Sequence, residues 1–232
     1  MKTTSDLLIY LLPAALLLIS LVLCGFSCFF FKKEKLVTYI TLKGGSVAAI
    51  TVLCLAVENL LGVRSIGGTT TFILIALVLQ LFSAIAVALP SKTNLFESLY
   101  SGLDMGSGLM LALAGLFLIS PSPFGLPIGF GVGAIASVIV ALALRKFNWK
   151  TDIFKYLSLT FGVALLAQVI VILLSTISVQ TILFAVASVL YFVAVIFKLF
   201  LNDEIKGIAI AKNVIYYLSL ILFVFSIYSV IF

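Results

Sequence analysis

The chain has 232 residues, of which 64% are hydrophobic and only 9% are charged. Soluble domains are roughly 25% charged, so this composition excludes an ordinary soluble domain and predicts a membrane protein. The sequence contains no histidine, which removes the commonest general base and metal ligand together with the usual Ser-His, Cys-His and zinc-hydrolase sites. We therefore expect no metal site and no cofactor.

Apolar segments recur along the chain at the length of a transmembrane helix, which is roughly 20 residues for a hydrocarbon core of about 30 Å. Short segments rich in Gly, Pro, Ser, Asn or charged residues separate them, as is typical of loops. Helices are expected because the lipid interior contains no water, so backbone N–H and C=O groups must form hydrogen bonds with one another. The sequence therefore predicts an all-α polytopic transmembrane bundle forming one domain, residues 1–232. Its eight spans run approximately Leu7–Phe31, Leu36–Leu61, Thr69–Leu89, Leu95–Ile119, Phe124–Leu144, Ile153–Leu174, Thr181–Leu201 and Ile208–Phe232.

The basic residues collect on one side of this predicted topology, and the net charge is +6. By the positive-inside rule that side is the cytoplasm, which places both termini on the non-cytoplasmic side. We expect an integral membrane protein, in the plasma membrane if the source is bacterial, with membrane lipid as partner and no nucleic-acid binding. The residues on the cytoplasmic side are Lys32, Lys33, Lys35, Lys92, Arg145, Lys146, Lys150, Lys155, Lys198, Lys206 and Lys212.

Few strongly polar side chains fall within the predicted spans, and such side chains usually face the bundle interior or a wet cavity. Lys43 and Asp104 each lie ~12 Å from the cytoplasmic end of their spans at 1.5 Å per residue. A Lys43–Asp104 pair would neutralise both charges, whereas an unpaired charge at the helix centre costs ~3 kcal/mol. The alternative, equally weighted, is that Lys43 extends its ammonium to the cytoplasmic headgroups.

The remaining polar residues in the spans have structural interpretations. Glu58 is expected to pair with Arg64 at the outer interface, and Gln80 and Gln168 are expected to form hydrogen bonds between helices worth ~1 kcal/mol or less. Glycines spaced by four residues predict close helix packing, or room for a lipid chain. These are Gly102 with Gly106, and Gly125 with Gly129 and Gly133.

Four fragments in chain order resemble the YhhN-type membrane proteins, a family that includes lysoplasmalogenases. The second span carries Thr41-Leu-Lys43, where the family has a T-K-P-like pattern and this chain has Gly44 in place of proline. LQLFSAIAVAL in the third span and ILFAVASVLYFV in the seventh are similar to family patterns like LFSLLGDVLLML and LLFVLSDSLLAL. NVIYYLSLILFVFSI in the last span matches a Tyr-Tyr-Leu-Ala-Gln-Leu-Leu pattern, and the number of predicted spans also fits.

The resemblance implies a lipid substrate, because family enzymes hydrolyse the vinyl-ether bond of lysoplasmalogens, which demands a positioned acid and base. The family's two aspartates correspond to Ala84 and Ser188 in this chain, and its late glutamine to Leu220. This departure makes hydrolysis doubtful. The candidate catalytic residue is therefore Asp104, and the candidate substrate-binding residues are Lys43, Gln80, Ser188 and Tyr216.

Two alternatives to an enzyme stay open. The first is a non-catalytic relative that keeps a lipid-binding or partner-binding role. The second is a small transporter component whose path Lys43, Asp104 and Gln168 line, although we find no convincing repeat between the first and last four spans.

Overall fold

A computed structural model of the chain describes residues 4–29, 36–60, 67–88, 94–119, 153–175, 177–200 and 206–227, together with seven positions between 127 and 142. Within these residues the chain is helical, with short connections and no strand. The helices are α1 (Thr4–Phe29), α2 (Leu36–Leu60), α3 (Gly67–Ala88), α4 (Asn94–Ile119), α6 (Ile153–Ser175), α7 (Val179–Phe200) and α8 (Lys206–Ser226).

Five of the described helices, α1, α3, α4, α7 and α8, contain segments long and apolar enough to cross a membrane, as in an integral membrane protein. The apolar segments of α2 and α6 are shorter, Thr41–Val57 and Leu157–Ile172. The all-helical class is thus confirmed, and a helix forms at seven of the eight predicted spans. The fifth, Phe124–Leu144, lies mostly outside the described residues, although the seven positions described within it are helical. The total of eight spans and the sides of the termini stay predictions.

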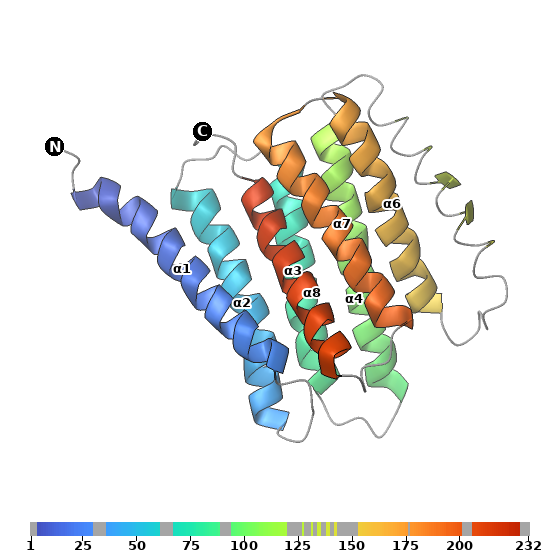
Figure 1. The fold of residues 1–232 in the computed structure, drawn as a ribbon, viewed down its shortest axis with the longest axis horizontal. Helices are drawn as coiled ribbons and strands as arrows, with labels where there is room; N and C mark the ends of the chain where they lie inside the picture. The colour runs from blue at the N-terminus through green and yellow to red at the C-terminus, as the bar shows by residue number, and fades with distance from the viewer. Residues whose placement is uncertain are drawn as a thin grey trace.

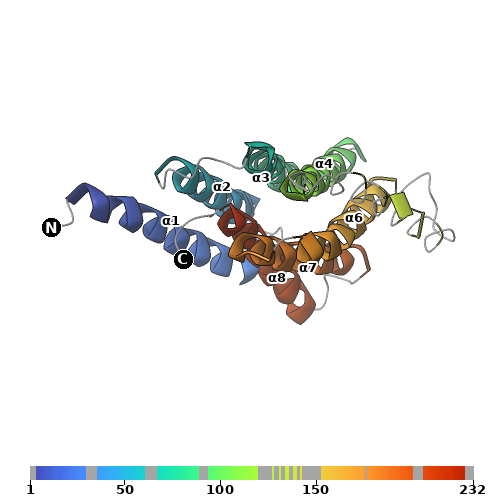
Figure 2. The same cartoon turned by 90° about the horizontal axis from the view of Figure 1, so that it is seen from above.

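The helices form two layers (Figures 1 and 2). One layer contains α2, α3 and α4, and the other contains α1, α8, α7 and α6. Contacts between neighbouring helices close the layers into a ring, and α8 also packs against α2 and α3 across the bundle. Helix α8 therefore contacts α1 and α7 in its own layer and α2 and α3 in the other.

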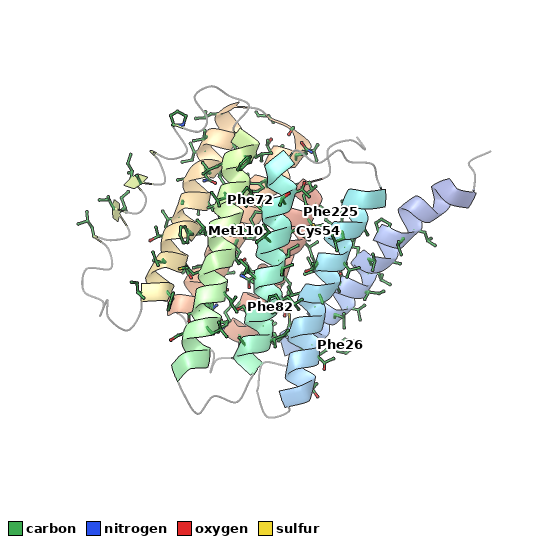
Figure 3. The ribbon with its side chains drawn as sticks, turned by 180° about the vertical axis from the view of Figure 1, so that it is seen from behind. Phe26, Cys54, Phe72, Phe82, Met110 and Phe225 are labelled. Atoms are coloured by element: carbon green, nitrogen blue, oxygen red, sulfur yellow. The ribbon has the colours of Figure 1, made fainter. Side chains whose placement is uncertain are left out.

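Helices that follow one another in the chain run in opposite directions, except that α4 and α6 are parallel (Figure 1). The ends of α1, α3 and α7 and the starts of α2, α4, α6 and α8 therefore lie at one edge of the bundle. We name this the basic edge, because α6 and α8 begin there with Lys155 and Lys206 in their first turns and α7 ends there with Lys198 in its last turn. In Figure 3, Phe26 and Phe82 lie toward the basic edge and Phe72 and Phe225 lie toward the opposite edge.

Large apolar side chains fill the interior, as expected where close packing must hold helices together in lipid. Phe184 of α7 and Phe223 of α8 are fully buried and meet edge to face with ring centroids 5.2 Å apart. Many of the exposed side chains are also large and apolar, and this is the surface that a protein presents to lipid. The bundle therefore has apolar side chains on both its inside and its outside.

Among the described glycines, the least room for an added Cβ is found at positions other than those singled out from the sequence. An added Cβ at Gly115 of α4 would lie 2.2 Å from Gln168 Oε1 of α6, and one at Gly68 would lie 2.7 Å from the Phe117 ring. At Gly102 and Gly106 the nearest atoms are 3.8 and 3.4 Å away, so the packing there is ordinary. Gly125, Gly129 and Gly133 lie outside the described residues.

Candidate functional site

A chain of polar side chains from four helices lies inside the bundle and is centred on Asp104 of α4. Lys198 of α7 forms an ion pair with it, with 2.6 Å between Lys198 Nζ and Asp104 Oδ2. The Gln80 amide of α3 donates a hydrogen bond of 3.2 Å to Asp104 Oδ1. In turn the Tyr216 hydroxyl of α8 donates to Gln80 Oε1 at 2.5 Å. Together with Tyr100, these residues are named the Asp104 cluster.

The order of donors and acceptors in the Asp104 cluster fixes the orientation of each group. Because Gln80 Oε1 accepts from Tyr216, the amide NH₂ points toward Asp104, where it meets one carboxylate oxygen. The other carboxylate oxygen is then directed to Lys198. A buried carboxylate needs such partners because an uncompensated charge in a low-dielectric interior is costly. Each carboxylate oxygen of Asp104 therefore has a polar partner from another helix.

Lys198 is the member of the cluster that the sequence did not single out as a site residue. The charge count assigns it to the cytoplasmic side of the predicted topology, and the structure places it in the last turn of α7. Helical Cα–Cβ bonds tilt toward the helix N-terminus, so its stem points back into the bundle. Its ammonium lies 4.1 Å from the centroid of the Tyr100 ring, within range of a cation–π contact. The signal in the sequence was its position before Leu199 and Phe200, inside the apolar segment.

A second polar group joins α1, α2 and α8, and we name it the Lys43 cluster (Lys43, Asn213, Tyr217 and Ser27). Lys43 Nζ donates to Asn213 Oδ1 at 2.7 Å and lies 5.7 Å from the centroid of the Tyr217 ring. The hydroxyls of Tyr217 and Ser27 are 2.7 Å apart and share a hydrogen bond. Asn213 and Ser27 were also missed from the sequence, because short polar side chains in an apolar helix give only a weak signal.

The predicted Lys43–Asp104 pair is wrong. Asp104 is paired with Lys198, and Lys43 donates to Asn213. The depth estimate was consistent with a meeting of the two residues, but it gave no information on which helices are neighbours. Since α7 and α8 each supply a partner, the lateral arrangement of the bundle decided the pairing.

Three of the five candidate site residues, Asp104, Gln80 and Tyr216, are joined directly by hydrogen bonds. The prediction that Gln80 bonds between helices is confirmed. Lys43 belongs to the neighbouring cluster, through Asn213 on the same helix as Tyr216. Ser188 is buried and donates a hydrogen bond of 2.8 Å to the Phe184 carbonyl of its own helix, so it is not connected to Asp104 by any bond among the described residues.

The other polar predictions have different outcomes. Gln168 is buried, but its Oε1 accepts no hydrogen bond within the described part of the chain, and it lies against Gly115 instead. For Gln168 Oε1 the expected interhelical hydrogen bond is therefore absent. The expected Glu58–Arg64 pair lies outside the described side chains. Leu220, at the position of the family's glutamine, is buried among apolar neighbours.

The geometry defines what the Asp104 cluster can do chemically. A carboxylate that meets an ammonium at one oxygen and an amide at the other can bind cations and hydrogen-bond donors. Comparison of the chain with protein-family models, with curated proteins and with solved structures gives no match. The class that the fold defines is an all-helical bundle whose apolar helices are those of an integral membrane protein.

Proposed function

We propose that this chain is an integral membrane protein of the YhhN or lysoplasmalogenase-like type that binds a single-chain lipid, with the polar end of the lipid at the Asp104 cluster. The observation that carries the proposal is the connected set Lys198, Asp104, Gln80 and Tyr216 inside an otherwise apolar bundle. Ionisable groups within a membrane bundle are costly, and they mark functional sites by default. The resemblance to a lipid-metabolising family supplies the class of ligand.

The place of the cluster supports a lipid rather than a small soluble ligand. Lys198 lies in the last turn of α7, at the basic edge of the bundle. A ligand with its polar end there can keep its hydrocarbon chain beside the apolar interior, where α3, α4, α7 and α8 pack together. A basic edge also attracts anionic groups of lipid headgroups. A polar cluster at one edge and apolar packing beyond it match the two ends of a single-chain lipid.

The same contacts favour binding over hydrolysis. Cleavage of a vinyl ether begins with proton donation to its β-carbon, and a general acid must supply that proton. Both oxygens of Asp104 are engaged within the protein, Oδ2 by the Lys198 ammonium and Oδ1 by the Gln80 amide, and neither is directed at a ligand. Ser188 donates its hydroxyl proton to its own helix, and Ala84 has only a methyl group. We therefore propose a binding protein, and we regard turnover as the outcome that would replace this proposal.

Binding can be tested on the full chain in an uncharged maltoside detergent, with native mass spectrometry and a titration of lysophosphatidylcholine. We expect saturable binding that Gln80→Leu weakens about tenfold, since loss of a hydrogen bond to a charged group costs about 1.5 kcal/mol. Gln168→Leu is the matched control, because this buried glutamine lies outside the cluster, and it should leave binding unchanged. Equal weakening by both substitutions, or no saturable binding, would contradict the proposal.

Catalysis is tested in the same preparation by supplying a lysoplasmalogen and measuring fatty aldehyde. No release is expected. If aldehyde is released, if Asp104→Asn abolishes the release and if Gln168→Leu preserves it, the chain is a vinyl-ether hydrolase and Asp104 takes part in its chemistry.

A further inference from the structure

The Asp104 cluster contains an ammonium group that belongs to the chain itself. Lys198 Nζ lies 2.6 Å from a carboxylate oxygen of Asp104 and 4.1 Å from the centroid of the Tyr100 ring. A carboxylate beside an aromatic face is the environment that proteins use to bind organic ammonium ions. We propose that Asp104 and Tyr100 form a binding site for the ammonium group of a ligand, which Lys198 occupies until the ligand displaces it.

The two oxygens of Asp104 have separate roles. Gln80 occupies Oδ1, and Tyr216 keeps the Gln80 amide in the orientation that donates. Only Oδ2 faces the cation. The site therefore accepts one cation at a time, so a ligand ammonium and Lys198 compete for it.

Of the two charged partners, Lys198 is the one that can leave. The Asp104 side chain is 11% exposed and lies in the middle of α4, where Gln80 holds it. The Lys198 side chain is 29% exposed and lies in the last turn of α7. A lysine near the end of a membrane helix can extend its long stem to the headgroup region. Exchange therefore moves Lys198 outward and leaves Asp104 in place.

Only a cationic group can take the place of Lys198. Removing one partner of a buried ion pair leaves an uncompensated charge, which strongly opposes displacement by a neutral or anionic group. The ligand class is thus an organic ammonium, either in the headgroup of a zwitterionic lysolipid or as a small free amine. In the first case this inference rests on the proposed function, and the displaced Lys198 becomes available to the phosphate of the same ligand.

Displacement can be measured on the unchanged protein in an uncharged maltoside detergent. An amine-reactive reagent is added with lysophosphatidylcholine or with choline, and labelling of each lysine is read by mass spectrometry. The proposal expects the probe to raise labelling of Lys198 severalfold and to leave Lys43, which donates to Asn213, unchanged. Unchanged labelling of Lys198, or an equal rise at Lys43, overturns it.

Competition also predicts an effect on affinity. If Lys198 fills the site in about nine molecules of ten, its removal lowers the apparent dissociation constant about tenfold. Lys198→Met should therefore bind lysophosphatidylcholine about tenfold more tightly than the unchanged protein, and Tyr100→Leu should bind it more weakly. Should Lys198→Met fail to fold, the labelling of the unchanged protein and the Tyr100→Leu affinity decide the question.

An anionic lysolipid separates this inference from the proposed function. If lysophosphatidylglycerol binds and exposes Lys198 as well as lysophosphatidylcholine does, the ammonium site is overturned while lysolipid binding stands. If choline alone exposes Lys198 and no lysolipid binds, the ammonium site is supported and the proposed function fails. Preference for the choline lipid over the glycerol lipid supports both.

Discussion

The bundle contains two lysine-centred clusters that share α8 but differ in the group that meets the ammonium. Lys198 meets a carboxylate at 2.6 Å, whereas Lys43 meets the amide oxygen of Asn213 at 2.7 Å. The distances are nearly equal, yet the consequences of losing the lysine are not. Without Lys198 the bundle retains a buried negative charge, while without Lys43 the Asn213 amide that remains is neutral. The charge of the partner, more than the distance to it, therefore decides how much a buried lysine contributes to the stability of the bundle.

The largest expected effect follows from Lys198→Met, which keeps an apolar stem and removes the charge. Breaking a buried ion pair costs about 3–5 kcal/mol, and because the Lys198 side chain is 29% exposed we expect about 2–3 kcal/mol. Thermal or denaturant unfolding in detergent measures the loss. The double variant Asp104→Asn/Lys198→Met should recover most of it, since no charge is then left unpaired. A double variant no more stable than the single one would show that Asp104 is not the source of the cost.

The substitution Lys43→Met is the direct counterpart and should destabilise less, by about 1–2 kcal/mol, as for a hydrogen bond between a charged and a neutral group. The same unfolding assay applies. If Lys43→Met costs as much as Lys198→Met, the distinction between the two clusters is wrong.

Substitution of Tyr216 or Tyr217 should change the free energy of unfolding less, but it tests more directly whether the two clusters are independent. Tyr216→Phe removes the bond to Gln80, and Tyr217→Phe removes the bond to Ser27, each worth about 0.6 kcal/mol in a membrane bundle. Combined with Lys198→Met, Tyr216→Phe should be non-additive because the two residues belong to one network, whereas Tyr217→Phe should be additive. Double-mutant cycles of unfolding free energy measure both terms. Coupling of Tyr217 to Lys198 as large as that of Tyr216 would mean that the clusters act as one.

The smallest expected change in stability comes from glycine substitutions in α2 and α4, the helices that contain Lys43 and Asp104. An added Cβ at Gly45, two residues after Lys43 in α2, meets nothing within 4 Å, so Gly45→Ala should stabilise by about 0.5 kcal/mol through helix propensity. At Gly108 in α4 an added Cβ would lie 3.4 Å from the Tyr191 hydroxyl, and Gly108→Ala should give no such gain. A destabilised Gly45→Ala variant would show that the Lys43 side of the bundle has less room than the structure indicates.

The sequence predicted the helices well because a long apolar segment has few other options in lipid. It also singled out Asp104, Gln80 and Tyr216, which the structure joins by hydrogen bonds, since polar side chains inside apolar segments are conspicuous. The partner of Asp104 could not be predicted in the same way. Counting residues gives the depth of a side chain to within about one helical turn, but it gives neither the rotation of the helix nor its neighbours. Lys43 and Asp104 lie at similar depths on helices that the bundle does not bring together at this point.

The adjacent residues Tyr216 and Tyr217 of α8 bond to different helices, Tyr216 to Gln80 of α3 and Tyr217 to Ser27 of α1, and their ring centroids are 5.3 Å apart. Successive residues of an α-helix project about 100° apart. A rotation of α8 about its own axis would therefore move both hydroxyls away from their partners. Two contacts therefore fix the rotation of α8 about its own axis: the Tyr216 hydrogen bond to Gln80 of α3 and the Tyr217 hydrogen bond to Ser27 of α1.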